Sequence, residues 1–229
     1  MEITIDPRFC GPATSGNGGY TCGLVAAHVG EPAEVTLRRP PPLGRSLRVA
    51  RVEGGVEVYD GEVLVAEAGP AGVQLDLPEP VDVPTAERAA AHYSGFKEHA
   101  FPTCFVCGPE REDGLGIFAS AVEGRDLVAA PWVPSADLAD GDGAVRREFV
   151  WAALDCPGAF AVGFSGRGEL LLGRLAARVD RAPQAGEHCV VVGWPLGADG
   201  RKLYAGTALF SERGDAYAAA HATWIEPLG

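Results

Sequence analysis

The chain has 229 residues, of which 47% are hydrophobic, and a formal net charge of −12. This charge argues against a nucleic-acid-binding surface and against binding to an anionic membrane surface, and no apolar run approaches the roughly 18 residues that a membrane span needs. The N-terminus has neither the basic segment nor the apolar segment of a signal peptide, so we expect a cytoplasmic protein whose six cysteines are reduced.

The first predicted helix covers residues 17–30. Asn17 is a suitable N-cap, and Gly30 is a suitable stop. The first turn contains Gly18 and Gly19, although a glycine in a helix costs about 1 kcal/mol relative to alanine. Their position indicates that the structure requires a bare backbone there.

Strands follow this helix. Residues 46–55 and 56–68 alternate apolar and polar side chains, with turns expected at Gly54–Gly55 and Asp60–Gly61. Residues 76–103 are expected to form a connector that contains one short helix.

The second half has a similar order of elements. A helix is predicted over residues 146–162, and residues 174–180 have the alternation of a strand. Residues 201–225 are predicted to form two long strands joined by a turn at residues 211–215.

The two halves share a short motif. RPPPLG, residues 39–44, and RAPQAG, residues 181–186, both have the pattern R-x-P-x-x-G, and each is expected between two strands. Each motif follows one helix and precedes a run of strands. Runs of strands with a single helix favour an α+β fold with antiparallel sheets, in two units of about 100 residues each.

Three stretches resemble known sequences. CFVCGPEREDGLGIF, residues 104–118, resembles the opening strand of the phenylacetyl-CoA thioesterase-like branch of the thioesterase superfamily. Residues 149–161 and 200–225 are similar to that branch's central helix and its closing strand pair. The chain therefore resembles a tandem, or double, hotdog protein, which implies two curved antiparallel sheets, each wrapped around one central helix.

The resemblance also implies the domain organisation. We expect an N-terminal hotdog over residues 1–75, a connector over residues 76–103 and a C-terminal hotdog over residues 104–229. Two fused halves form a pseudo-dimer within one chain, and further pairing into a homodimer is open.

The family resemblance suggests a role for the glycine pair. In such thioesterases the central helix often begins with a His-Gly-Gly-like turn, whose backbone amide polarises the thioester carbonyl. Asn17, Gly18 and Gly19 match this turn, with Asn in place of His. The family's catalytic carboxylate lies nine residues after the His, and that position is Ala26 in this chain.

The second half has the complementary composition. Asp155 stands at the carboxylate position, whereas residues 146–148, Arg-Arg-Glu, stand where the glycine turn would be. Paired hotdogs take the donor turn from one half and the acid from the other, so the resemblance implies one complete site, formed by Gly18 or Gly19 with Asp155. Pro157 is expected to bend or end the helix just after this acid.

The implied function is hydrolysis of an acyl-CoA thioester. Asp155 would activate water as a general base or attack the carbonyl to form a mixed anhydride. We expect Arg146, Arg147 and Tyr20 to bind the substrate, with the arginines near the CoA phosphates. The alternative is a non-catalytic protein that binds an acyl-CoA or small hydrophobic ligand, and Asn17 in place of the histidine keeps this alternative open.

The remaining chemistry-bearing residues are cysteines. Cys104 and Cys107, with His92 and His99 upstream, have the spacing of half a zinc site. A second pair with ligand spacing is absent from the sequence. We therefore expect these cysteines, and Cys156, to pack as small buried side chains, and we predict no metal and no cofactor.

Overall fold

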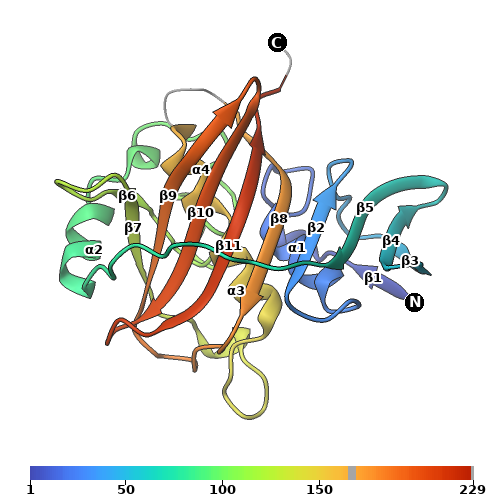
Figure 1. The fold of residues 1–229 in the computed structure, drawn as a ribbon, viewed down its shortest axis with the longest axis horizontal. Coiled ribbons are helices and arrows are strands. Elements are labelled where there is room, and N and C mark those ends of the chain that lie inside the picture. The colour runs from blue at the N-terminus through green and yellow to red at the C-terminus, as the bar shows by residue number, and fades with distance from the viewer. Residues whose placement is uncertain (165–168, 228–229) are drawn as a thin grey trace.

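The computed structural model describes residues 1–164 and 169–227. Within them, one antiparallel sheet of eleven strands has the order β1-β3-β4-β5-β2-β8-β11-β10-β9-β7-β6 (Figure 1). The strands are β1 (Glu2–Thr4), β2 (Ala33–Leu37), β3 (Ser46–Val52), β4 (Gly55–Asp60), β5 (Val63–Pro70), β6 (Ser120–Ala121), β7 (Val128–Trp132), β8 (Leu171–Val179), β9 (Cys189–Asp199), β10 (Lys202–Ser211) and β11 (Ala216–Ile225). The helices are α1 (Gly18–Ala26), α2 (Val83–Ala90), α3 (Arg147–Ala153) and α4 (Cys156–Ala161), with short 3-10 helices η1 (Pro7–Phe9), η2 (Ser94–Phe96) and η3 (Ala136–Leu138).

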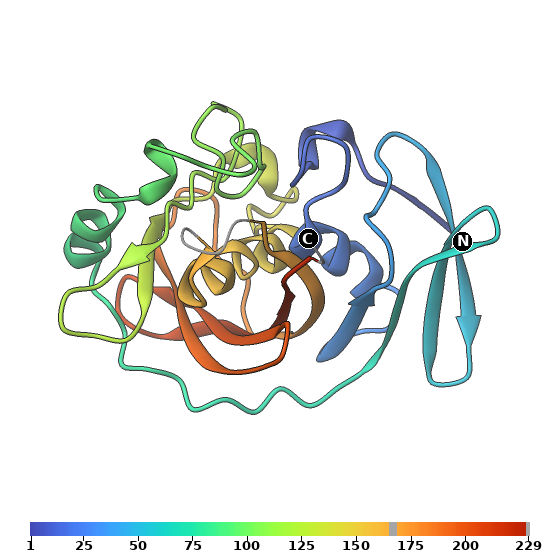
Figure 2. The same ribbon diagram turned by 90° about the horizontal axis from the view of Figure 1, so that it is seen from above.

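The sheet curves around the helices, as Figure 2 shows. Strands β1–β5 come from the first half of the chain and strands β6–β11 from the second. They meet where β2 pairs with β8, with Val35 opposite Leu175. The expected antiparallel α+β architecture is confirmed. The β2–β8 hydrogen bonds join the curved sheets of the two halves into one continuous sheet.

The predicted strand pattern is confirmed in both halves. In β8, the side chains of Leu175, Ala177 and Val179 are buried, as the alternation predicts. Gly54 and Gly61 have φ angles of 80° and 59° at the two predicted turns, a conformation that glycine adopts readily.

Helices α1 and α3 lie side by side on the inner face of the sheet (Figure 1). A Cβ atom added at Gly19 would lie 2.6 Å from the Trp151 carbonyl oxygen, and one at Gly23 would lie 2.5 Å from the Glu148 Cα. Residues four apart lie on one face of a helix, so these glycines form a smooth face against the α3 backbone. Close helix packing is therefore one requirement for bare backbone in α1.

The helix predicted over residues 146–162 is two helices, α3 and α4. Pro157 lies in the first turn of α4, where its missing N–H costs least. The backbone of Asp155 is not helical, with φ −79° and ψ −81°. Thr207 Oγ1 donates a hydrogen bond of 2.8 Å to the Leu154 carbonyl at this break. The predicted bend before Pro157 is confirmed, and it places Asp155 at the junction of the two helices.

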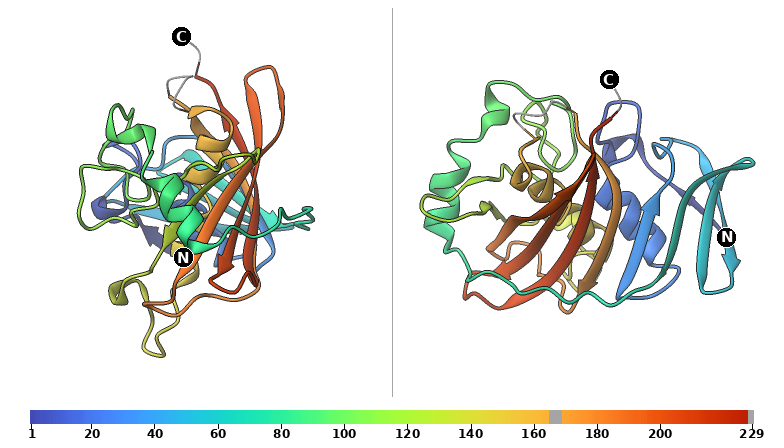
Figure 3. Two further views of the ribbon diagram at one scale, coloured as in Figure 1. Left: turned by 90° about the vertical axis from the view of Figure 1, so that its left-hand side faces the viewer. Right: turned by 45° about the horizontal axis from the view of Figure 1, so that its top comes forward.

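The segment between β5 and α2 crosses the outer face of the sheet (Figures 1 and 3). The segment and α2 bury a second apolar cluster against this face, which includes Val81, Ala86, Ala89, Val190, Val192 and Phe210. The predicted connector thus contains the expected short helix and covers the C-terminal half of the sheet. None of the helices in the described ranges is long and apolar enough to cross a membrane.

The R-x-P-x-x-G segments occupy similar places in the two halves. Ser15 forms an isolated antiparallel bridge with Pro42, and Ala144 forms one with Gln184. In each half, the chain just before the central helix therefore pairs with its own motif segment. The sequence repeat corresponds to a repeated local structure.

Candidate functional site

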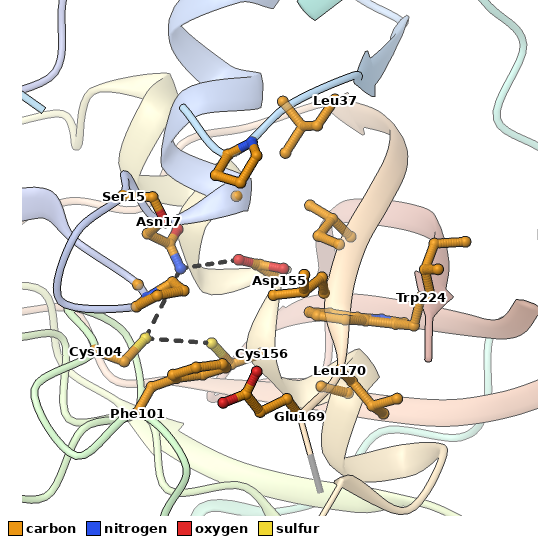
Figure 4. A pocket seen from close by; sticks show the side chains of 18 of the residues that line it. Ser15, Asn17, Leu37, Phe101, Cys104, Asp155, Cys156, Glu169, Leu170 and Trp224 are labelled. Carbon is orange, nitrogen blue, oxygen red and sulfur yellow. Dashed lines mark hydrogen bonds between the residues drawn. The ribbon is translucent and has the colours of Figure 1, made fainter. Parts of the chain in front are cut away.

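Asp155 lies at the break between α3 and α4 and is 2% exposed. Its Oδ2 atom accepts a hydrogen bond of 2.9 Å from Asn17 Nδ2 (Figure 4) and another of 2.9 Å from the Gly19 backbone amide. The carboxylate comes from the second half of the chain and both donors come from the N-terminus of α1. The expected meeting of Asp155 with the glycine turn is confirmed.

Asn17 can hold the carboxylate because its amide group has two functions. Its Oδ1 accepts a hydrogen bond of 2.9 Å from the Tyr20 amide, which caps α1. Its Nδ2 is then directed toward Asp155. An aspartate at this position could cap the helix but could not donate to a second carboxylate.

The environment of Asp155 changes its acidity. Burial raises the pKa of its carboxyl to about 7, while the hydrogen bond from the Gly19 amide acts in the opposite direction. Its Oδ1 atom is buried and has no hydrogen-bond partner among the described residues. This oxygen is the acceptor that could take a proton near neutral pH.

A cavity of about 500 Å³ lies beside Asp155 (Figure 4). This volume is in the range of small-molecule sites. Most of its surface is apolar, and it includes side chains from both halves, among them Leu37, Phe101, Phe160, Leu170, Leu172 and Trp224. The cavity therefore combines an apolar wall with one buried carboxylate.

The two glycine amides have different surroundings. The Gly19 amide donates to Asp155, so it is not available to a substrate carbonyl. The Gly18 amide has no acceptor within the described residues, and Gly18 lines the cavity. The expectation of Gly18 or Gly19 as donor is therefore narrowed to Gly18, whose amide is at the positive end of α1.

Several solved structures match nearly the whole chain. The tesB protein of Mycobacterium avium subspecies paratuberculosis has a TM-score of 0.64 and 14% identity, covering 99% of this chain and 92% of its own. A proposed thioesterase from Novosphingobium aromaticivorans has a TM-score of 0.65 and 16% identity, covering 99% and 95%. A proposed thioesterase II from Thermobifida fusca has a TM-score of 0.60 and 14% identity, covering 99% and 92%. No protein-family model and no curated protein sequence matches this chain.

This chain shares its fold with these solved structures. The shared fold agrees with the double hotdog resemblance of the sequence. Identities of 14–16% establish the fold alone, so the chemistry has to be argued from the site.

Arg146 and Arg147 do not line the cavity beside Asp155, contrary to expectation. Arg147 pairs with Glu31 and donates a hydrogen bond of 2.8 Å to the Val179 carbonyl. The Arg146 guanidinium lies 4.6 Å from the centre of the Phe149 ring. Because α3 runs antiparallel to α1, its N-terminus, which carries both arginines, lies at the end away from Asp155.

Tyr20 also lies outside the cavity. It is buried among aromatic rings, with ring centres 4.3 Å from Phe9 and 5.5 Å from Phe149. Burial raises the pKa of its hydroxyl to about 12. Tyr20 therefore packs in the core rather than at the cavity.

Two basic residues at the cavity were not predicted from the sequence. Arg38 and Arg39 line it and are exposed. Arg38 pairs with Glu67 at 2.5 Å, whereas Arg39 has no ion pair within the described residues. Arg39 is the first residue of the RPPPLG motif, so the motif itself contains a basic residue that could have been considered. Only the structure, in which Arg39 follows the end of β2, shows that this residue borders the cavity.

A second cavity, of about 440 Å³, lies between Ala26 and the N-terminus of α3. Glu31 borders it and accepts hydrogen bonds from Trp151 Nε1 at 2.7 Å and from the Val179 amide at 3.2 Å, besides its ion pair with Arg147. Ala26 has no side chain that could act as an acid. The cavity at Ala26 therefore contains a structural ion pair, whereas the cavity at Asp155 has a carboxylate with an unpaired oxygen.

Three cysteines lie together beside Asp155. The sulfur atoms of Cys104, Cys107 and Cys156 all lie within 4.8 Å of one another. From the sequence, Cys104 and Cys107 were considered with His92 and His99 as half a zinc site, and Cys156, which follows Cys107 by 49 residues, was not joined to them. Only the packing of α4 brings the third sulfur to the pair, so no local sequence signal could have identified it.

Proposed function

We propose that this protein hydrolyses acyl-CoA thioesters at a single site between its two halves. The observation that supports this most strongly is the buried Asp155 carboxylate, held by Asn17 and Gly19 at the edge of a largely apolar cavity. A thioesterase requires such a base beside a pocket for the acyl group. The second position, at Ala26, has no equivalent carboxylate.

The chemistry follows from the two unused groups of the site. The thioester carbonyl oxygen accepts a hydrogen bond from the Gly18 amide, which stabilises the oxyanion. Asp155 Oδ1 takes a proton from water as the hydroxyl attacks the carbonyl carbon. The carbon–sulfur bond then breaks, and the CoA sulfur takes the proton from Asp155. We prefer this general-base role over direct attack because a pKa of about 7 suits proton transfer near neutral pH.

The cavity also indicates the substrate. Phe101, Phe160, Phe164 and Trp224 contribute aromatic surface to its wall, which favours an apolar or aromatic acyl group, as in phenylacetyl-CoA. Arg39 is exposed at the cavity and could contact a CoA phosphate. The six cysteines are free thiols, which supports the cytoplasm as the site of action.

A non-catalytic ligand-binding protein is the second candidate. The observation that favours it is the 2% exposure of Asp155, which limits access to the carboxylate. In this case the same cavity would bind an acyl-CoA without releasing free CoA.

The two candidates are separated by turnover of a panel of acyl-CoAs, with the released CoA thiol detected by a disulfide reagent. The panel includes short, long and aromatic acyl groups. We expect thiol release with at least one apolar or aromatic acyl-CoA. Saturable binding of that acyl-CoA without any thiol release would support the ligand-binding protein and contradict the enzyme.

A further inference from the structure

We propose that Cys104, Cys107 and Cys156 bind a zinc ion through their three sulfur atoms. This site goes beyond the proposed hydrolysis and does not depend on it. It reverses the sequence-based expectation of no metal, which considered Cys104 and Cys107 with His92 and His99 and treated Cys156 as a packing residue. Three buried thiols within 4.8 Å of one another are the ligand type that zinc prefers.

The separation of Cys104 Sγ and Cys156 Sγ agrees with tetrahedral coordination. Two sulfur atoms that each lie about 2.3 Å from a tetrahedral zinc ion are about 3.8 Å apart. Cys104 Sγ and Cys156 Sγ are 3.8 Å apart. A disulfide requires about 2.05 Å, so the observed separation fits two ligands of one ion better than a pair about to bond.

The neighbours of the sulfur atoms are suited to thiolates. Phe101 donates its amide hydrogen to His99 Nδ1 at 2.9 Å, which leaves the ring proton on Nε2. That Nε2 atom lies 3.4 Å from Cys107 Sγ and 2.8 Å from the Tyr93 hydroxyl. His99 can therefore donate a hydrogen bond to the Cys107 sulfur, as residues around metal ligands commonly do.

The site connects a segment that has little regular structure of its own to the start of α4. Residues 91–119 contain only the short helix η2, yet Phe105, Val106 and Ile117 are fully buried. An ion bound to Cys104 and Cys107 on this segment and to Cys156 at the start of α4 would stabilise the segment against the helix. Folding free energy from zinc is typical of such irregular segments.

The cavity gives the ion one more coordination position. A tetrahedral zinc ion held by three protein ligands keeps one position for water or another small ligand. All three cysteines line the cavity beside Asp155, so that position is reached from the cavity. Binding releases the thiol protons and transfers no electrons, so it needs no oxidant or reductant.

The test uses metal content and absorption rather than activity. The full chain is purified without chelators, its zinc is measured, and the zinc is then replaced by cobalt. We expect about one zinc ion per chain and, with cobalt, the charge-transfer and visible bands of tetrahedral thiolate ligation. Cys104→Ser, Cys107→Ser and Cys156→Ser are each expected to reduce or abolish both signals, whereas Cys189→Ser, a buried thiol outside the cluster, keeps them.

The wild-type result decides the proposal even if the cysteine variants fail to fold. A folded wild-type chain that contains no zinc and gives no thiolate bands with cobalt would overturn it. A Cys104–Cys156 disulfide found by mass spectrometry of the unreduced wild-type protein would overturn it as well.

Discussion

At the scale of single residues, the site depends on the pairing of Asn17 with Asp155. One amide caps α1 through its oxygen and holds the carboxylate through its nitrogen. The sequence identified both residues, because the N-cap preference and the family resemblance point to them. It could not show that the Gly19 amide is taken by the carboxylate, since that depends on how closely α1 and α3 approach.

The two functions of Asn17 can be separated by substitution. Asn17→Ser keeps a capping oxygen but loses the donor to Asp155, and Asn17→Ala loses both. We expect both variants to lower kcat/KM for thioester hydrolysis. Only Asn17→Ala is expected to lose the further roughly 1 kcal/mol of unfolding free energy that a cap contributes. Denaturant unfolding and steady-state kinetics measure the two effects, and equal unfolding free energies for Ser and Ala would refute the capping role.

Asp155 also predicts a pH dependence of stability. Its folded-state pKa of about 7 lies above the ordinary value of 3.8, so the folded protein retains a proton that the unfolded chain loses. The resulting stabilisation is fully present below pH 3.8 and is lost as the pH rises to about 7. Relative to Asp155→Asn, the wild type is expected to lose roughly 4 kcal/mol of unfolding free energy across this window. A difference that does not change with pH would show that the carboxyl titrates normally.

At the scale of secondary-structure elements, the glycines of α1 are explained mainly by packing against α3. An isolated helix would gain about 1 kcal/mol from each Gly→Ala change. In the protein, a Cβ at Gly19 or Gly23 would lie 2.5 Å from Asp155 Cβ or Glu148 Cα, and such overpacking costs about 1–3 kcal/mol.

We therefore expect Gly19→Ala and Gly23→Ala to lower the melting temperature. Gly18→Ala is the matched control, because its Cβ would meet only the Leu172 side chain, at 2.8 Å, which can move more easily than backbone. We expect a smaller loss of stability for this variant. Differential scanning calorimetry compares the three, and a rise in melting temperature for Gly19→Ala and Gly23→Ala would mean that helix propensity outweighs packing.

Most elements could be predicted because periodicity and turn residues are local. The strand pair at 201–225 and the break before Pro157 follow directly from sequence. Helix α1 ends at Ala26, four residues before the predicted end at residue 30. The residues after it form a turn, in which the Val29 amide donates to the Ala26 carbonyl. The sequence pattern does not distinguish this turn from a last turn of helix. The position of Arg146 outside the cavity beside Asp155 could not be predicted, because it depends on the orientation of α3, which is a tertiary property.

At the scale of the whole molecule, one continuous sheet brings the two halves together and creates two cavities with different chemistry. The cavity at Asp155 is largely apolar and has a carboxylate with an unpaired oxygen. The cavity at Ala26 contains the Glu31–Arg147 ion pair. The sequence indicated this asymmetry, because the acid is missing from one half and the glycine turn from the other.

The asymmetry predicts that the second cavity cannot be activated by restoring its acid. Ala26 is fully buried, so Ala26→Asp places a carboxylate where Arg147 and Glu148 replace the glycine turn. We expect no increase in kcat per chain and a loss of several kcal/mol of unfolding free energy, because a buried charge without adequate partners is costly. Turnover and denaturant unfolding of this variant check the prediction, and a doubled kcat would contradict the single-site account.

The central claim is that Asp155 is the base of a thioesterase. It is tested most directly by kcat/KM for the acyl-CoA that the wild type hydrolyses best, measured for Asp155→Asn and for Asp76→Asn, an exposed aspartate with the same change. We predict a loss of about 10²–10⁴-fold for Asp155→Asn and no change for Asp76→Asn, with circular dichroism confirming that both are folded. A folded Asp155→Asn protein that hydrolyses the substrate at the wild-type rate would contradict the account.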